Sequence, residues 1–359
     1  MSLEEKFDLE AEEKKEWSSL DVEDEIINPP VIETSSFGIS YLDESLRGIE
    51  KTDLIILGGK SGRGKTQACT LMALDSIRRK KNVYMFALEA EGKEIQKRIF
   101  YHLTERVLFR RLDKDVLSTF NFNYADWRQG KYRTIINEHV GEIKEIIEPY
   151  KQYLNVYYKG VHFDQQTLKN KVMNLKGKAD LIILDHLNYI DIPGVKENKE
   201  IDEIMQAVRD LTLINEIPII VVAHCRKSGN QDKSLVPGIE DFMGSSNIFK
   251  NAVKCVMIAP YEDKDIQKER YQFPTLIHVG KFRHDGSVTR YAGVCNYNAK
   301  NNKYEDEYTV GELKKMRCDF EELEGDGLPH WAISHRPMPK KEKPKMAQMR
   351  VRKIQGIDD

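Results

Sequence analysis

The sequence predicts an α/β fold: a mostly parallel central sheet flanked by helices, with a β-hairpin region toward the C-terminus. Short runs rich in β-branched residues alternate with longer helix-like segments, a pattern typical of parallel strands joined by crossover helices. The strand-like runs are largely apolar, which indicates that both faces of the sheet are covered. With 359 residues, the chain is long enough for two domains or for one large α/β domain with insertions.

Five apolar runs mark the predicted parallel strands. They are Leu54–Leu57, Val83–Leu88, Leu181–Leu184, Ile217–Val222 and Val253–Ile258. Helical stretches follow several of them, for example at Thr66–Arg79 and Ile201–Asn215. A later pair of segments, Thr275–Lys281 and Val288–Tyr297, flanks the turn residues His284-Asp285-Gly286 and predicts a β-hairpin.

The two ends of the chain differ in composition from its middle. Residues 1–28 carry 11 acidic against 3 basic side chains, and Pro29-Pro30 ends this stretch. We expect residues 1–32 to be an acidic arm and linker, either solvated and disordered or helical and docked on a neighbouring subunit. Residues 336–359 hold eight basic side chains and three prolines, which predict a disordered tail or, alternatively, a contact with nucleic acid or a protein partner. Residues 33–335 are the expected folded domain.

Composition excludes several classes of protein. No run approaches the roughly 18 apolar residues that span a bilayer, and the acidic N-terminus lacks the apolar region of a secretory signal. The five cysteines are scattered, odd in number and free of C-x-x-C pairs, which argues against disulfide or cysteine–zinc frameworks and favours a reducing compartment. We therefore expect a cytoplasmic protein without a membrane partner. Because the net charge is only −2, any nucleic-acid site must be local.

The strongest signal is the run Gly59-Lys60-Ser61-Gly62-Arg63-Gly64-Lys65-Thr66, which fits the phosphate-binding pattern G-x-x-x-x-G-K-[ST] in full. It stands between a predicted strand and a predicted helix, as this pattern requires. Its glycines let consecutive N–H groups face the phosphates, and the helix N-terminus adds partial positive charge. In such loops Lys65 would reach the β- and γ-phosphates of ATP, and the Thr66 hydroxyl would ligate Mg²⁺. The alternative is a chance match, which the flanking elements disfavour.

Two carboxylates that follow predicted strands are candidates for the rest of an ATPase site. Asp185 ends the run that begins at Leu181 and would hold Mg²⁺, directly or through water, at the carboxyl edge of the sheet. Glu89 follows the run Val83–Leu88 and is the candidate general base for the attacking water, with Glu91 as the local alternative. The alternative for both carboxylates is a purely structural role at a strand end.

A histidine follows the next predicted strand. His224 comes after the run Ile217–Val222, where a polar side chain could sense the γ-phosphate and pass its presence to the following loop. That loop, Cys225–Lys233, is polar and basic. The alternative for His224 is a strand-end histidine whose hydrogen bonds are satisfied.

In combination these motifs resemble the RecA-fold motor domain of replicative hexameric DNA helicases, the DnaB and Twinkle group, over roughly residues 35–300. The matching segments are Phe37-Gly38-Ile39-Ser40-Tyr41-Leu42-Asp43 with Gly48, Phe86-Ala87-Leu88-Glu89 with Gln96 and Arg98, Leu184-Asp185-His186-Leu187, His224, and Phe242-Met243-Gly244-Ser245-Ser246. The resemblance implies a RecA-like P-loop ATPase core that uses ATP and Mg²⁺, with Glu89 as the catalytic base. His224 stands at the sensor position, where DnaB-like members carry Gln and Twinkle-like members carry His. His186 stands where the family usually has Tyr.

The segment Lys281-Phe282-Arg283-His284-Asp285-Gly286 resembles the K-x-R-x-x-G hairpin of the same family. The resemblance implies that Lys281 and Arg283 reach into the ATP site of the adjacent subunit. An arginine finger supplied in trans stabilises transition-state charge and makes hydrolysis depend on ring assembly. The alternative is that both side chains are exposed hairpin charges.

Two polar loops match those that line the DNA channel in this family. The candidates for contact with single-stranded DNA are Arg226, Lys227, Asn230 and Lys233, followed by Lys196 and Lys199 in the earlier loop. Binding of single strands needs cations that track the backbone, and these loops hold no aromatic residue, so we expect contacts to phosphates rather than readout of bases. Six copies of a short basic loop would concentrate charge in one channel. The alternative for each loop is a solvated surface turn.

These observations predict an ATP-dependent replicative DNA helicase that forms a ring, translocates on single-stranded DNA and unwinds duplex by hydrolysing ATP at subunit interfaces. The expected partners are single-stranded DNA, further copies of the chain in a hexamer, and a primase, polymerase or helicase loader. Only the acidic arm precedes the resembling segment, which suits a compact, phage-like form in the cytoplasm of a bacterium or a phage-infected host. The alternatives are a RecA- or RadA-type recombination or repair ATPase and a KaiC-like ATPase regulated by protein partners.

Overall fold

The computed structural model describes residues 31–60, 62, 64–90, 93–111, 122–160, 162–191, 197–225, 246–261, 272–298, 303–314 and 319–332. The chain divides into two compact units, Met1–Glu33 and Thr34–Asp359. The expected acidic arm, apart from its last two residues, and the expected basic tail lie outside the described residues. Within the described ranges, no helix is long and apolar enough to cross a membrane.

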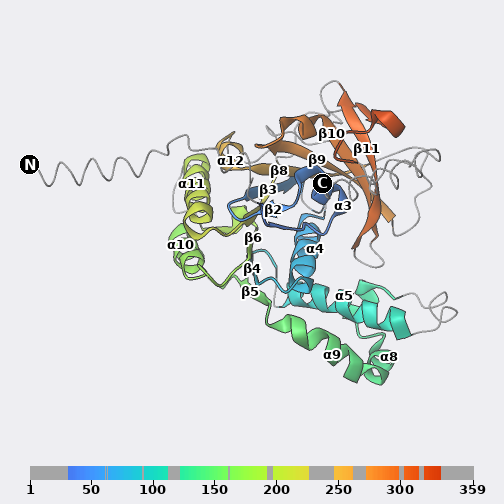
Figure 1. The fold of residues 1–359 in the computed structure, drawn as a ribbon. Helices are drawn as coiled ribbons and strands as arrows, with labels where there is room; N and C mark the ends of the chain where they lie inside the picture. The colour runs from blue at the N-terminus through green and yellow to red at the C-terminus, as the bar shows by residue number, and fades with distance from the viewer. Residues whose placement is uncertain are drawn as a thin grey trace, which may run out of the picture. The chain divides into compact units, whose positions relative to one another are not determined.

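A large sheet forms the centre of the second unit (Figure 1). Six of its strands run parallel in the spatial order β8-β3-β7-β6-β4-β5. Their bounds are β3 Leu54–Gly59, β4 Val83–Ala87, β5 Leu154–Tyr158, β6 Leu181–Asp185, β7 Ile219–His224 and β8 Lys254–Pro260. The five predicted strands are confirmed within this set, and β5 adds a further strand at the edge.

Four antiparallel strands extend the same sheet beyond β8. They are β9 Gln272–Phe282, β10 Tyr291–Asn298, β11 Lys303–Lys314 and β12 Asp319–Glu322. The predicted hairpin is confirmed as β9 and β10, but its second strand begins at Tyr291 rather than at Val288. The reason is a 3-10 turn at Gly286–Arg290, which starts where Oδ1 of Asp285 accepts a hydrogen bond from the Ser287 N–H at 3.0 Å.

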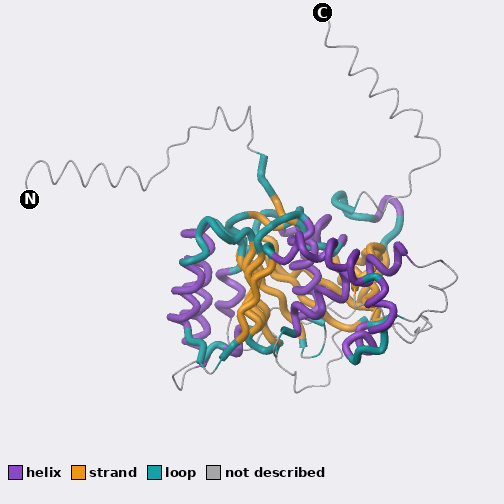
Figure 2. Tube along the Cα trace, turned by 90° about the horizontal axis from the view of Figure 1, so that it is seen from below, coloured by secondary structure: helices purple, strands orange, loops and turns teal. Residues whose placement is uncertain are grey.

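Helices cover both faces of the sheet, as the apolar strands predicted (Figures 1 and 2). They are α3 Ser40–Leu46, α4 Lys65–Arg78, α5 Glu94–Arg111, α7 Tyr124–Arg128, α8 Arg133–Glu138, α9 Val140–Lys151, α10 Gln165–Met173, α11 Glu197–Asn215 and α12 Ser246–Asn251. Side chains alternate along β3, so that Ile55 and Leu57 pack in the core with α3, α4 and α5. Leu54 and Ile56 pack in the opposite core with α10, α11 and α12. A small antiparallel pair, β1 Thr34–Ser35 and β2 Ile49–Glu50, flanks α3 in the chain.

Candidate active site

The register of the parallel strands brings the predicted site residues to one edge of the sheet. Gly59 at the end of β3 lies opposite His224 at the end of β7. Ala87 at the end of β4 lies opposite Asp185 at the end of β6. The backbone N–H of Cys225 also donates to the Gly59 carbonyl at 3.2 Å. Open α/β sheets bind their ligands at this carboxyl edge.

The phosphate loop joins β3 to α4 and uses backbone conformations that its glycines permit. Gly62 and Gly64 have φ values of 72° and 86°, a region that residues with a Cβ rarely adopt. Lys65 is 4% exposed, and its Nζ donates to the carbonyl oxygens of Gly59 at 3.0 Å and Lys60 at 2.9 Å. Burial lowers the pKa of Lys65, and nearby acidic groups oppose this shift. Two loop residues lie outside the described ranges: Ser61 and Arg63.

Asp185 is a buried carboxylate at the end of β6, with 0% exposure. Neither of its oxygens has a hydrogen-bond partner of normal length among the described residues. Burial raises the pKa of Asp185 to about 6, the Thr66 side chain lowers it, and the charge of Glu89 raises it further. Mg²⁺ takes oxygen ligands, and the unpartnered carboxylate beside the Thr66 hydroxyl provides them. The two predicted metal-binding residues therefore lie side by side and suit Mg²⁺.

Glu89 lies just beyond β4, and 39% of its side chain is exposed. Its Oε2 is 3.1 Å from Nε2 of His186, and the same nitrogen is 3.6 Å from Oδ1 of Asp185. An exposed carboxylate at this position can accept a proton from water, which a general base requires. Glu91, the alternative base, lies outside the described residues. In the sequence, His186 is marked only by its departure from a family pattern, whereas in the structure its ring lies beside both carboxylates.

Two histidine rings stack at this edge. The ring centroids of His186 and His224 are 3.9 Å apart, with an interplanar angle of 15°. Burial lowers the pKa of His186 to about 3, and the neighbouring charges of His224 and Lys65 lower it as well. Burial, followed by the charge of Lys65, also lowers the pKa of His224. Both imidazoles are therefore neutral at neutral pH.

A side-chain network joins α4 to α5 beside the phosphate loop. Arg98 donates through Nη1 to Oε1 of Gln67 at 3.1 Å and through Nη2 to Oε1 of Glu94 at 2.7 Å. Its guanidinium lies over the ring of Tyr124, 5.3 Å from the centroid. The charge of Arg98 also lowers the pKa of Asp185. The sequence matched Arg98 to a family pattern but did not predict this network, because its members come from separate helices.

Comparison with known families agrees with this geometry. Residues 35–306, which make up most of the chain and include the whole phosphate loop, match the family model of the DnaB-like helicase C terminal domain. The chain belongs to the DnaB-like helicase C-terminal domain family. The predicted resemblance is thereby confirmed.

Several relatives carry names from DNA replication. The replicative DNA helicase DnaB of Buchnera aphidicola subsp. Baizongia pistaciae is 24% identical over 218 residues, which cover 60% of this chain and 44% of that protein. The probable replicative DNA helicase of Trieres chinensis is 25% identical over 262 residues, covering 69% of this chain and 53% of that protein. The replicative DNA helicase DnaB of Haemophilus influenzae is 22% identical over 291 residues, covering 79% of this chain and 57% of that protein. The chain thus spans about half the length of these relatives.

Two solved structures share the fold. One, described as an ATPase domain, superposes with a TM-score of 0.62 at 16% identity, covering 85% of this chain and 99% of that chain. A DnaB-like replicative helicase, described with its interactions with primase, also superposes with a TM-score of 0.62 at 16% identity. This match covers 80% of this chain and 67% of that chain. The predicted RecA-like core with a mostly parallel sheet is confirmed by this likeness.

The two hairpin cations of this DnaB-like chain lie at the opposite edge of the sheet from its phosphate loop. Gly59 lies opposite Ile258, near the carboxyl end of β8. Lys281 lies opposite Cys255, near the amino end of the same strand. Arg283 follows β9 at this amino edge and is exposed. Both residues therefore lie away from the phosphate loop of their own chain.

Local contacts hold the hairpin cations at this edge. Nζ of Lys281 donates to the carbonyl oxygens of Phe249 at 2.7 Å and Lys250 at 3.0 Å, at the C-terminal end of α12. Burial lowers the pKa of Lys281. The backbone N–H of Arg283 donates to the carbonyl of Val253 at 3.0 Å, which anchors the backbone while the side chain is exposed.

Six residues are the predicted DNA contacts, and one of them, Lys199, lies within the described ranges. Five of these residues lie outside the described ranges: Lys196, Arg226, Lys227, Asn230 and Lys233. Lys199 is described, and it lies on α11 rather than in a loop, because α11 already begins at Glu197. Its Nζ is 3.5 Å from Oε1 of Glu203, one helical turn away.

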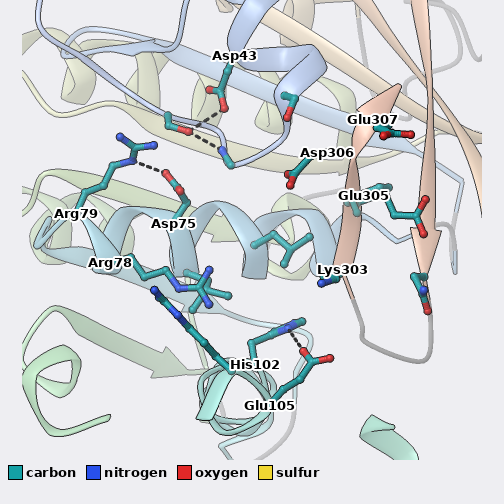
Figure 3. Close-up of a pocket in the computed structure, with 18 of the residues that line it drawn as sticks. Asp43, Asp75, Arg78, Arg79, His102, Glu105, Lys303, Glu305, Asp306 and Glu307 are labelled. Atoms are coloured by element: carbon teal, nitrogen blue, oxygen red, sulfur yellow. Dashed lines mark hydrogen bonds and ion pairs between the residues drawn. The ribbon is translucent and has the colours of Figure 1, made fainter. Parts of the chain in front are cut away.

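A separate cavity of about 1070 Å³ lies between α3, α4, α5 and β11. Figure 3 shows Arg78 and Arg79 near the end of α4 and the acidic residues 305–307 of β11 around it. Several of its charges are paired within the chain: Nε of Arg79 is 2.7 Å from Oδ2 of Asp75. The residues that line it do not include the phosphate loop, so this cavity is distinct from the candidate active site.

Proposed function

We propose that the chain is the motor of a ring-forming, ATP-dependent replicative DNA helicase, with residues 33–335 as the motor domain. One observation carries the proposal: the phosphate loop and its carboxylates gather at one edge of the sheet, and the hairpin cations lie at the other. Such a division lets one subunit of a ring present its cations to the nucleotide of the next. Membership of the DnaB-like family supports this function over a recombination ATPase or a KaiC-like ATPase.

The phosphates of ATP would bind to the backbone amides of residues 59–66 and to the positive end of α4. Lys65 would exchange its carbonyl partners, Gly59 and Lys60, for the β- and γ-phosphate oxygens. Thr66 and Asp185 would hold Mg²⁺. When bound, this ion supplies positive charge that stabilises the phosphate oxygens during transfer.

Hydrolysis would begin with transfer of a proton from the attacking water to Glu89. Nε2 of the buried His186 ring lies 3.1 Å from one oxygen of this carboxylate. His224 would sense the γ-phosphate and transmit its loss to the following loop. Arg283 and Lys281 of the adjacent subunit would stabilise the transition-state charge, so that hydrolysis requires the assembled interface.

Single-stranded DNA is the proposed substrate track. Arg226, Lys227, Asn230 and Lys233, with Lys196 and Lys199, are the proposed phosphate contacts, because cations that follow a backbone bind single strands without reading bases. A hexamer is the proposed assembly. A primase is a proposed partner because one structural relative is described with its interactions with primase. A polymerase and a helicase loader are further proposed partners. The proposed location is the cytoplasm of a bacterium or of a phage-infected host.

Unwinding of a forked DNA duplex tests this function. The wild-type chain should separate the strands only with ATP and Mg²⁺, and electron micrographs of the same sample should contain closed rings. Lys65→Ala is the control that removes the phosphate contact and should not unwind. DNA-stimulated ATP hydrolysis from filaments that never unwind a fork would instead support the recombination-type alternative.

A further inference from the structure

Three side chains with metal-binding atoms meet at the carboxyl ends of neighbouring strands. Glu89 follows β4, His186 follows β6 and His224 ends β7, and these strands are adjacent in the order β7-β6-β4. One carboxylate oxygen and two imidazole nitrogens all lie within 4.8 Å of one another. The sequence did not predict this cluster, because the three residues are far apart in the chain.

The spacing of these atoms matches that of ligands around a single small ion. Oε2 of Glu89 and Nε2 of His186 are 3.1 Å apart. Two ligands about 2.0–2.2 Å from a tetrahedral zinc ion are roughly 3.4 Å from each other. The His224 ring, stacked 3.9 Å from that of His186, places a third donor beside them. Because the lone pair of an imidazole nitrogen lies in the plane of its ring, one of the two stacked rings must rotate before both nitrogens face the same ion.

The donor set selects the class of metal. Two imidazoles and one carboxylate are typical zinc ligands, whereas Mg²⁺ prefers six oxygens in an octahedron. The cluster is thus chemically distinct from the adjacent Mg²⁺ pair of Thr66 and Asp185. Three protein ligands leave a fourth position for water. The exposed side of Glu89 gives an ion a path from solvent.

We propose that Glu89, His186 and His224 form a transition-metal site that binds Zn²⁺ and blocks ATP hydrolysis when occupied. A carboxylate that donates its electron pair to Zn²⁺ can no longer accept a proton from water. The proposed Zn²⁺ binding depends only on the positions of these three side chains, whereas the proposed inhibition rests on the proposed role of Glu89 as general base. The two parts are therefore measured separately.

Calorimetric titration tests binding directly, with Zn²⁺ added to the chelator-treated chain of 359 residues in the absence of nucleotide. His186→Tyr and His224→Gln remove one imidazole each and introduce the residue types that related helicases carry at these positions. Each should weaken Zn²⁺ binding by more than about 100-fold, because loss of an outer-shell partner alone costs roughly 10- to 100-fold. His162→Ala is the matched control, since this exposed histidine also lies near two carboxylates, 2.9 Å from Asp191 and 3.4 Å from Asp164. It should leave the site unchanged.

Co²⁺ provides a second measurement if one variant fails to fold. Four-coordinate Co²⁺ in the wild-type protein should give a visible absorption band that Zn²⁺ displaces and that folded His224→Gln lacks. Equal Zn²⁺ affinity in the wild type and in a folded His186→Tyr or His224→Gln would overturn the site. So would a loss of binding in His162→Ala alone.

Inhibition is then measured as ATP hydrolysis by wild type and by His162→Ala in excess Mg²⁺ and ATP. The rate should fall as the site fills, with the midpoint of the binding curve, and should recover when a chelator removes Zn²⁺. Binding without inhibition would overturn the inhibitory role and count against Glu89 as the base, while the metal site itself would stand.

Discussion

Nε2 of His186 lies 3.1 Å from Oε2 of Glu89. The histidine side chain is 2% exposed, whereas 39% of the glutamate side chain is exposed. One oxygen of the carboxylate therefore lies beside a buried ring while the side chain still reaches solvent. A carboxylate that reaches solvent can accept a proton from water, as a general base must.

Glu89→Gln removes the proton acceptor and keeps the shape of the side chain. We expect kcat for ATP hydrolysis to fall roughly 10²- to 10⁴-fold, the usual contribution of a general base, with little change in ATP affinity. Steady-state kinetics and equilibrium binding of a fluorescent ATP analogue measure the two quantities. Glu91→Gln is the control and should behave like wild type; a collapse of kcat in Glu91→Gln instead would show that the base is misassigned.

The placement of Arg283 at the far edge of the sheet predicts complementation between two inactive chains. Arg283→Ala lacks the finger but keeps its own phosphate loop, whereas Lys65→Ala lacks the loop cation but keeps the finger. The ATPase rate of each chain alone should be near zero, because every interface then lacks one of the two groups. When the two are mixed and reassembled, hydrolysis should return, because some interfaces then join an intact loop to an intact finger.

Arg290→Ala is the matched control for this experiment. Arg290 is another exposed arginine close to Arg283 in the chain, and its Nη2 is 2.7 Å from Oε1 of Glu312. An exposed ion pair of this kind contributes about 1 kcal/mol or less, so this variant should retain hydrolysis. Mixtures of Arg283→Ala and Lys65→Ala that stay inactive, although mixed assemblies form, would argue against a finger in trans.

Asp185 should make the stability of the nucleotide-free protein depend on pH. Its pKa is raised to about 6 in the folded chain, chiefly by burial, whereas the pKa of an unfolded aspartate is about 4. Between these values the folded state binds more protons, so the charge on Asp185 costs stability as the pH rises. Asp185→Asn carries no charge at any pH.

The free energy of unfolding of Asp185→Asn should therefore exceed that of wild type by about 3 kcal/mol above the folded pKa, and the excess should vanish below about pH 4. Urea denaturation of both proteins without Mg²⁺, at several pH values across this window, measures the difference. A difference that does not change with pH would mean that Asp185 does not titrate as a buried carboxyl.

Local sequence patterns were sufficient to predict the parallel half of the fold. The strands β3, β4, β6, β7 and β8 are apolar runs because both of their faces are buried, and burial on both faces removes the need for polar alternation. The phosphate loop was equally predictable, because its glycines and Lys65 stand between a strand and a helix. Because the strands are parallel, the residues at their carboxyl ends then lie together at one edge of the sheet.

The antiparallel extension was predicted only in part. β11, Lys303–Lys314, begins with a run of charged residues and resembles a solvent-exposed segment. Its strand character depends on pairing with β10 and on burial of Tyr304 and Tyr308, and Oη of Tyr308 donates to Oε2 of Glu44 on α3 at 2.7 Å. Such contacts between distant segments leave no periodic signal in the sequence.

In the candidate active site, too, features set by local sequence patterns were predictable and features set by contacts between distant residues were not. The positions of Asp185 and Glu89 at the carboxyl edge were predictable, because Asp185 ends the apolar strand β6 and Glu89 lies just beyond the apolar strand β4. The contact of His186 with Glu89 was not, because it depends on where one ring points after the end of β6. The network of Arg98 with Gln67 required the packing of α5 against α4, which no local motif records.

Steady-state ATP hydrolysis with and without single-stranded DNA tests the central proposal most directly. A motor that tracks DNA should hydrolyse ATP faster when single strands are present, and Arg283→Ala should lose this stimulated rate while still binding nucleotide. A wild-type rate that is the same with and without DNA, measured on assembled rings, would contradict the proposed DNA-tracking motor.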